Sequence, residues 1–301
     1  MKKIIRAFIS WFSYFGLKFL IFWVRFLPEK VIYSLGELLS DLYYIGSGKN
    51  RKLALRNLEL ALGSQLSKAR LKVIIRESCR IMGRAILDTI YYKNLSDEQI
   101  REFIAIEGLE NLEKASKKGK GIIIVSAHMG SFTLIGYRLM LEGYKANYVA
   151  RHMRDKKLEH ILMNLSRNTG QKVIFSDPIV TFYRRGMRVL SRNEALILEV
   201  DQNFGREGVP VNFFGRQARV ASGPLVLAMR TKAVILPIFI TSETVNRHVI
   251  KIEPPLELNF SGNHETDIRN NLQKIINVIE GYIRRYPGQW FNWVHKRWEV
   301  K

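Results

Sequence analysis

The chain has 301 residues, 47% of them hydrophobic and 25% charged, and 48 Lys and Arg against 27 Asp and Glu give a formal net charge of +21. This composition excludes a small disulfide scaffold, a collagen and a disordered tail, because it supplies ample apolar material for a large core. The charge indicates acidic partners at the surface, such as anionic lipid headgroups, an acidic protein or nucleic acid. Lys and Arg are scattered from Lys2 to Lys301, which argues against nucleic acid.

The single cysteine, Cys79, lies in an amphipathic stretch and has no intramolecular partner. A disulfide or a thiolate-rich metal site is therefore excluded. We expect Cys79 to be a small buried residue, the common state of a free cysteine.

The amino-terminal residues 4–27 are long and apolar enough to approach a membrane span, but Arg6, Lys18 and Arg25 interrupt them. On a helical wheel the polar residues fall within about 140° of arc and leave a wide apolar face. This pattern predicts a membrane-anchor helix over residues 1–27, either lying in the interface or spanning with a tilt. A cleaved signal peptide and a buried helix are the alternatives, although no uncharged core or small-residue cleavage site is present.

Residues 28–118 show helical periodicity, with apolar residues at three- and four-residue spacing over 31–44, 49–62 and 67–92. We expect a helical layer here, within one domain over residues 28–301. From Gly119 onward, short apolar runs alternate with helix-like segments, which predicts an α/β core with a mainly parallel central sheet flanked by helices. The predicted strands are 121–127, 146–150, 172–175, 195–200, 233–240 and 248–253, and the predicted helices are 132–141, 157–168, 179–191, 223–231 and 265–285.

Ligands of such sheets collect beyond the carboxyl ends of the strands. His128 stands at this edge, directly after the first buried strand, and Gly130 allows a substrate to approach the backbone there. The chain has no G-x-x-x-x-G-K-[ST] loop and no G-x-S-x-G turn. Nucleotide hydrolysis and serine-hydrolase chemistry therefore lack their usual sequence support.

The block around His128 resembles the His-x-x-x-x-Asp/Glu motif of the lysophospholipid acyltransferase superfamily, and in particular its branch of late lipid A acyltransferases. The resemblance covers nearly the whole chain in the expected order. Its segments are LPEKVIYSLGELL (27–39), RKLALRNLELAL (51–62), GIIIVSAHMGSF (121–132), YVAR (148–151), RNTG (167–170), EVDQNFGREGVPVNFFGRQARVASGP (199–224) and YPGQWFNWVHKRW (286–298).

The resemblance implies that His128 is the general base on an acceptor hydroxyl, which attacks the thioester of acyl carrier protein or acyl-CoA. It implies an anionic glycolipid acceptor, such as a lipid A precursor, and a catalytic domain at the cytoplasmic side of the inner membrane. No cofactor and no metal are implied.

The family's acidic residue, five positions after the histidine, is Thr133 in this chain. Three explanations follow: another carboxylate replaces it, the Thr133 hydroxyl holds the ring, or the chain is a catalytically impaired lipid-binding homologue. Asp201 and Glu199 are the best replacements, because both close a predicted strand beside the one that precedes His128. Glu142 is a poor one, about 13 Å further along a helix.

The resemblance also points to substrate contacts. Arginines suit phosphate or carboxylate recognition, and the start of a helix suits a phosphate. The closing aromatic segment, with Trp290, Trp293 and Trp298, suits either a membrane interface or the core. We expect His152, His160, His248 and His264 to be structural or exposed, because their spacing does not suit metal ligation. The candidate substrate-binding residues are Arg151, Arg167, Gln202, Arg216, Ser222 and Gly223.

Overall fold

The computed structural model describes residues 2–63, 65–168 and 170–298. Within helical segments, the side chains of residues 2–10, 12, 13, 167 and 168 are outside this description.

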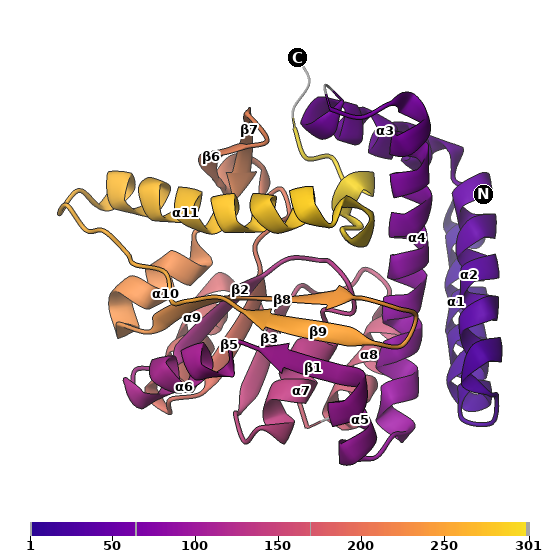
Figure 1. Ribbon diagram of the computed structural model, residues 1–301, viewed down its shortest axis with the longest axis horizontal. Helices are drawn as coiled ribbons and strands as arrows, with labels where there is room; N and C mark the ends of the chain where they lie inside the picture. The colour runs from indigo at the N-terminus through magenta and orange to yellow at the C-terminus, as the bar shows by residue number, and fades with distance from the viewer. Residues whose placement is uncertain (1, 64, 169, 299–301) are drawn as a thin grey trace.

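A seven-stranded sheet forms the centre of the described chain, in the order β1-β9-β8-β2-β5-β3-β4 (Figure 1). All neighbouring strands are parallel except β8 and β9, which are antiparallel. The prediction of an α/β fold with a mainly parallel sheet is confirmed. The strands are β1 (Ile104–Glu107), β2 (Ile122–Ser126), β3 (Ala146–Ala150), β4 (Lys172–Phe175), β5 (Ala195–Glu199), β8 (Val234–Ser242) and β9 (His248–Ile252).

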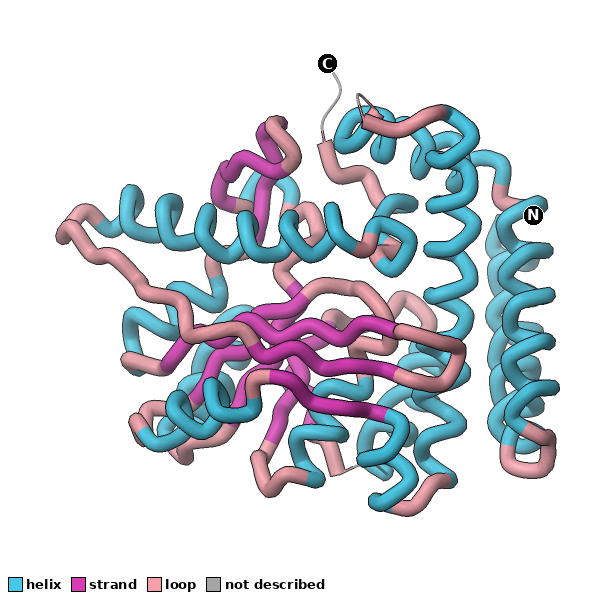
Figure 2. Tube along the Cα trace, viewed as in Figure 1, coloured by secondary structure: helices cyan, strands magenta, loops and turns pink. Residues whose placement is uncertain are grey.

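Both faces of the sheet are covered, which is why its central strands are continuous apolar runs. In β2, Ile123 and Val125 belong to the core on one face, and Ile122 and Ile124 to the core on the other. Figures 1 and 2 show the layers on the two sides. The first face is covered by α9 (Ile179–Ser191), α10 (Gly223–Thr231) and α11 (His264–Arg285), and the second by α5 (Asp97–Phe103), α6 (Leu109–Lys117) and α7 (Leu134–Leu141).

The amino-terminal third supplies a helical layer beside the sheet (Figure 1). Its helices are α1 (Lys2–Val24), α2 (Glu29–Gly46), α3 (Gly48–Leu62) and α4 (Lys68–Tyr91). Cys79 is buried in α4, as expected. The segment expected to be a helical layer, 28–118, differs in one respect: β1 lies within it and forms the edge of the central sheet beside β9.

The helix α1 packs against α4 and α8 (Lys156–Asn168), and Val24, Leu165 and Leu87 share a small apolar cluster there. In the part of the chain that the structure describes, no helix is both long enough and apolar enough to cross a membrane.

A two-stranded antiparallel hairpin, β6 (Val209–Phe213) and β7 (Arg216–Val220), packs beside α11 and was not predicted. The chain then closes with two short 3-10 turns, Pro287–Gln289 and Asn292–Val294. Trp290 and Trp293 are fully buried in this segment, so the aromatic end of the chain packs into the core.

Candidate active site

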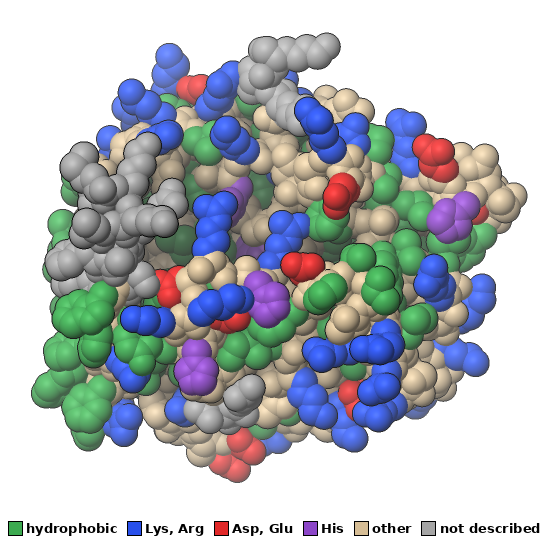
Figure 3. All heavy atoms as spheres, turned by 180° about the vertical axis from the view of Figure 1, so that it is seen from behind, with side chains coloured by type: hydrophobic (Ala, Val, Ile, Leu, Met, Phe, Trp, Pro, Cys, Tyr) green, Lys and Arg blue, Asp and Glu red, His purple; other side chains and the backbone are tan. Residues whose placement is uncertain are grey.

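His128 follows β2 at the carboxyl edge of the sheet and lines a cavity of about 1250 Å³. The walls of this cavity come from α4, α7 and α8, the ends of β3 and β5, and the start of α10. Figure 3 shows a hollow on the rear face with histidine inside it and Lys and Arg side chains around it. The histidine ring is 20% exposed, so it is open to a ligand in the cavity but largely shielded from bulk water.

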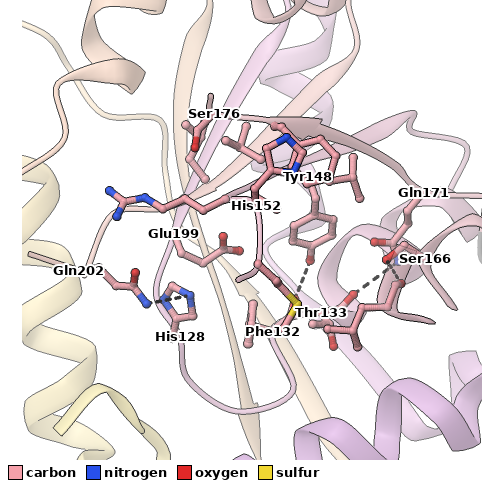
Figure 4. Close-up of a pocket in the computed structure, with 18 of the residues that line it drawn as sticks. His128, Phe132, Thr133, Tyr148, His152, Ser166, Gln171, Ser176, Glu199 and Gln202 are labelled. Carbon is pink, nitrogen blue, oxygen red and sulfur yellow. Dashed lines mark hydrogen bonds between the residues drawn. The ribbon is translucent and has the colours of Figure 1, made fainter. Parts of the chain in front are cut away.

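Asp201 holds the His128 ring from the loop that follows the adjacent strand β5. Its Oδ1 lies 2.7 Å from the ring Nδ1, and its Oδ2 accepts the His128 backbone N–H at 3.0 Å. A carboxylate only accepts hydrogen bonds, so the ring carries a proton on Nδ1, and in the neutral ring Nε2 keeps its lone pair. The side-chain amide of Gln202 approaches Nε2 at 3.5 Å (Figure 4).

Asp201 is itself held from three sides and has no exposed surface. Trp290 Nε1 and Asn292 Nδ2 donate to Oδ2 at 2.6 and 2.7 Å. The Arg297 guanidinium donates to the Asp201 backbone carbonyl. These donors all come from the carboxyl-terminal segment. That segment therefore holds Asp201 in the position from which its carboxylate orients the His128 ring.

The pKa values of His128 and Asp201 are shifted in opposite directions. Burial lowers the pKa of His128, but the charge and hydrogen bond of Asp201 outweigh burial and leave the pKa above its usual value. Burial favours a higher pKa for Asp201, but His128 and the Trp290 hydrogen bond hold that pKa well below its usual range. Asp201 is therefore an anion beside a histidine of increased basicity.

Thr133, the position of the missing acid, faces away from this pair. Its hydroxyl forms a hydrogen bond of 2.8 Å with the Thr89 hydroxyl on α4, and its carbonyl accepts from Gln171 at 3.4 Å. Figure 4 shows Thr133 on the Gln171 side of the cavity, separated from the His128 ring. Of the explanations for Thr133, the geometry favours replacement by Asp201.

Glu199, the alternative carboxylate, also reaches the cavity, two residues before Asp201. It does not bond to the ring in the structure, and its Oε1 is buried without a hydrogen-bond partner. Burial raises the pKa of Glu199 to about 7.

The predicted substrate-binding residues divide into three groups. Arg151, Gln202, Ser222 and Gly223 line the cavity, and the Arg151 guanidinium lies 4.8 Å from the centre of the Phe204 ring. Arg216 is not part of the cavity wall, because it starts β7 and donates to the Leu60 carbonyl at 3.3 Å. The Arg167 side chain lies outside the described residues.

Of the other histidines, His248 is buried and structural. Its Nε2 lies 3.4 Å from the carboxylate of the buried Asp88, which also accepts from the Tyr33 hydroxyl at 2.6 Å and from the Ser131 hydroxyl. This cluster ties α2, α4 and β9 to the loop that carries His128. Among the residues that the structure describes, no group of three or more His, Cys, Asp or Glu could hold a metal ion.

The residues that sequence reasoning missed are those that hold Asp201: Trp290, Asn292 and Arg297. Their signal was present in the closing aromatic segment, because an indole and an amide are hydrogen-bond donors that need partners when buried. Nothing in the sequence connected that segment to a strand end 89 residues earlier.

Comparison with known proteins identifies the family. The family model described as "Bacterial lipid A biosynthesis acyltransferase" matches residues 1–300. The Lipid A biosynthesis palmitoleoyltransferase of Escherichia coli is 26% identical over 295 residues, covering 97% of this chain and 92% of the relative. A Phosphatidylinositol mannoside acyltransferase of Mycobacterium tuberculosis is 28% identical over 155 residues, which are 50% of this chain and 47% of the relative.

Among solved structures, the 1-acyl-sn-glycerophosphate (LPA) acyltransferase PlsC of Thermotoga maritima matches 86% of this chain and 98% of its own, with a TM-score of 0.37 and 15% identity. The family model spans nearly the whole chain and the relatives are named acyltransferases. The protein is therefore an acyltransferase and belongs to the bacterial lipid A biosynthesis acyltransferase family.

Proposed function

We propose that this acyltransferase moves a fatty acyl chain from a thioester donor to a hydroxyl of a lipid A precursor or a related phosphoglycolipid, with His128 as the general base. The donor is acyl carrier protein or acyl-CoA. The curated relatives named for lipid A and for phosphatidylinositol mannoside support a glycolipid acceptor.

The observation that carries this proposal is the His128–Asp201 pair at the wall of the cavity. Since Asp201 occupies Nδ1, Nε2 is the atom that accepts the proton of the acceptor hydroxyl, displacing the long contact with Gln202. The hydroxyl oxygen forms a bond to the thioester carbon, giving a tetrahedral intermediate. When this collapses the C–S bond breaks, and the imidazolium returns its proton to the leaving thiolate.

The cavity supports both substrates. Apolar side chains such as Leu162, Val173 and Ile86 offer a surface for an acyl chain. Arg151, Ser222 and Gly223 supply a guanidinium and a helix start for anionic groups of the donor or acceptor.

We also propose that the protein works on the inner membrane, with the catalytic domain facing the cytoplasm. Large apolar side chains are exposed along α1 and α2, including Phe19, Trp23, Leu38 and Leu42. Figure 3 shows apolar side chains gathered on the side of the molecule where these helices lie. An exposed apolar patch of this kind suits the interface of a bilayer, where the cationic chain also finds anionic headgroups.

The alternative is a lipid-binding homologue without catalytic activity, which the absence of an acid at Thr133 favours. The hydrogen bond between Asp201 and the His128 ring supports the catalytic function instead, because it supplies the carboxylate that Thr133 lacks.

The test is transfer of a labelled acyl chain by the full-length protein in membranes. The acceptors are a tetra-acylated lipid A precursor and lysophosphatidic acid, each offered with acyl carrier protein and with CoA thioesters. We expect transfer to the lipid A precursor. Transfer to lysophosphatidic acid alone, or to neither acceptor with either donor, would contradict the proposal.

A further inference from the structure

Glu199 occupies a position in the active-site wall that the pair of His128 and Asp201 does not use. It is the last residue of β5. In the register of β2 and β5 it lies opposite Ser126, and Ser126 precedes His128 by two residues. Side chains alternate along a strand, so Glu199 points to the same face as Ile197 and, on β3, Tyr148. Figure 4 shows the Glu199 carboxyl group between the His128 ring and Tyr148.

Two oxygens at this point have no partner in the described part of the chain. Glu199 Oε1 and the neighbouring Ser126 Oγ are both buried and make no hydrogen bond. Tyr148 does not serve them, because its hydroxyl donates to the Phe132 carbonyl and accepts from the Gly136 N–H. Buried polar atoms without partners are rare in proteins and call for an explanation. Of the two residues, Glu199 lines the cavity, so its carboxyl group is the one that a ligand can reach.

The surroundings of Glu199 favour its neutral form. Burial is the main cause that raises its pKa to about 7, and the Asp201 charge adds to it, whereas His128 acts in the opposite direction. Tyr148 faces the carboxyl from β3, and Arg151 lines the cavity at the end of that strand. A neutral carboxylic acid has an O–H to donate, whereas an ionised one only accepts.

We propose that Glu199 is a further catalytic residue, whose O–H donates a hydrogen bond to the thioester carbonyl oxygen as that oxygen becomes the oxyanion of the tetrahedral intermediate. This rests on the proposed acyl transfer. The hydroxyl proton goes to His128, the acceptor oxygen bonds to the carbonyl carbon, and the π electrons of the carbonyl move to its oxygen. Glu199 keeps its proton throughout, and the carbonyl re-forms when the thiolate leaves.

Such a donor acts where charge develops, so its removal lowers kcat rather than raising KM. The experiment compares wild type with Glu199→Gln and Glu199→Ala, and records kcat and KM from pH 5.5 to pH 9. Glu257→Gln is the matched control, because Glu257 is an exposed carboxylate outside the cavity. Thermal unfolding of each variant monitors the fold.

For wild type we expect a bell-shaped profile, whose falling limb reflects loss of the Glu199 proton. Glu199→Gln keeps an N–H donor and cannot ionise, so its kcat at pH 6 stays within about tenfold of wild type and the falling limb disappears. At pH values above the pKa of the falling limb, the kcat of Glu199→Gln divided by that of wild type therefore grows by about tenfold per pH unit. Glu199→Ala loses on the order of 10²–10³ in kcat with KM little changed.

Three results would overturn the assignment. The first is a wild-type kcat in Glu199→Ala, and the second is a falling limb that remains in Glu199→Gln. The third is an equal loss of kcat in both variants, which would mean that the ionised carboxylate is required. If Glu199→Ala does not fold, the presence or absence of the falling limb in the isosteric Glu199→Gln tests the assignment by itself. His128→Ala separates the two proposals. Full activity in that variant defeats the general base, whereas its loss beside an unaffected Glu199→Ala defeats only the role of Glu199.

Discussion

At the scale of single residues, the proposed mechanism gives the two ring nitrogens of His128 different tasks. Asp201 holds the proton on Nδ1. Nε2, which has only a long contact with the Gln202 amide, would accept the proton of the substrate. Because Asp201 is buried and anchored by Trp290 and Asn292, its charge is available without reorganisation during the reaction.

Replacing Asp201 with Asn removes that charge while keeping the shape. We expect kcat to fall by on the order of 10⁴, the effect seen when the orienting carboxylate of a histidine base is lost in serine proteases. Asp201 raises the pKa of His128, so its loss lowers that pKa and moves the rising limb of kcat/KM to lower pH. Steady-state kinetics from pH 5 to pH 8 measure both effects. Glu257→Gln, which removes an exposed carboxylate outside the cavity, is the control and keeps wild-type kinetics.

Thr133 provides an independent test of which residue supplies the acid. Its hydroxyl bonds to Thr89 rather than to the ring. Thr133→Glu therefore gains no activity, and it loses some because a larger charged group enters the cavity wall beside α4. The assay is acyl transfer at saturating donor. A rise of several-fold above wild type would show that the natural site lacks a working acid.

The part of the site that could be predicted from the sequence consists of residues that directly follow predicted strands. His128 and Asp201 follow adjacent parallel strands, and the rule that ligands gather at the carboxyl edge of a sheet predicts from the sequence that they lie close together. Arg216 does not lie beside Ser222 in the cavity wall, because the hairpin β6–β7 carries it toward α3, where it donates to the Leu60 carbonyl. Sequence spacing does not reveal the path of a hairpin.

At the scale of elements, the carboxyl-terminal segment forms hydrogen bonds that hold the residues following β5 in place. Trp290 also pairs in a β-bridge with Met129, so this one residue contacts both Asp201 and the immediate neighbour of His128. This explains why a tryptophan is fully buried there with its N–H directed at a carboxylate.

Trp290→Phe keeps most of the packing but removes the N–H donor to Asp201. A hydrogen bond to a charged group contributes about 1.5–3 kcal/mol, so we expect the free energy of unfolding to fall by roughly that amount. Activity falls as well, because the carboxylate is held less firmly. Chemical denaturation and kcat are the measurements. Unchanged values of both would show that the indole hydrogen bond has no role.

Most of the elements followed from hydrophobic periodicity, and the misses have physical reasons. The ranges of β3, β4, α9 and α10 match their predicted ranges, because these elements bury continuous or amphipathic apolar faces. The strand β1 has four residues at a sheet edge, too short for a period to show. In the hairpin, β6 contains Pro210 and β7 carries two arginines, so neither resembles a core strand.

At the scale of the whole molecule, a basic surface and an exposed apolar side occur together. The sequence predicted the apolar face of α1, but the exposed leucines of α2 became evident only from the packing of α2 against α4. Leu17 of α1 also lines the cavity, so the apolar side is continuous with the entrance to the active site. Under the proposed docking on a membrane, a lipid acceptor would approach His128 along this side.

Substituting Leu38 and Leu42 together with Glu tests this arrangement, since both are 55% exposed on α2. If these side chains enter the interface, each loses a burial contribution of roughly 1.5–3 kcal/mol. We therefore expect binding to vesicles of phosphatidylethanolamine and phosphatidylglycerol to weaken at least about tenfold. Phe260→Glu, an exposed apolar residue outside α1 and α2, is the control. Equal binding by all three proteins would contradict membrane docking through α2.

The central claim is that the free Nε2 of His128 takes the proton of the acceptor hydroxyl. Its most direct test is the single-turnover rate of acyl transfer, measured at saturating substrates for wild type, His128→Gln and the control His264→Gln. We predict a loss on the order of 10²–10⁴ for His128→Gln alone, at unchanged thermal stability. A single-turnover rate within threefold of wild type in folded His128→Gln would contradict the account.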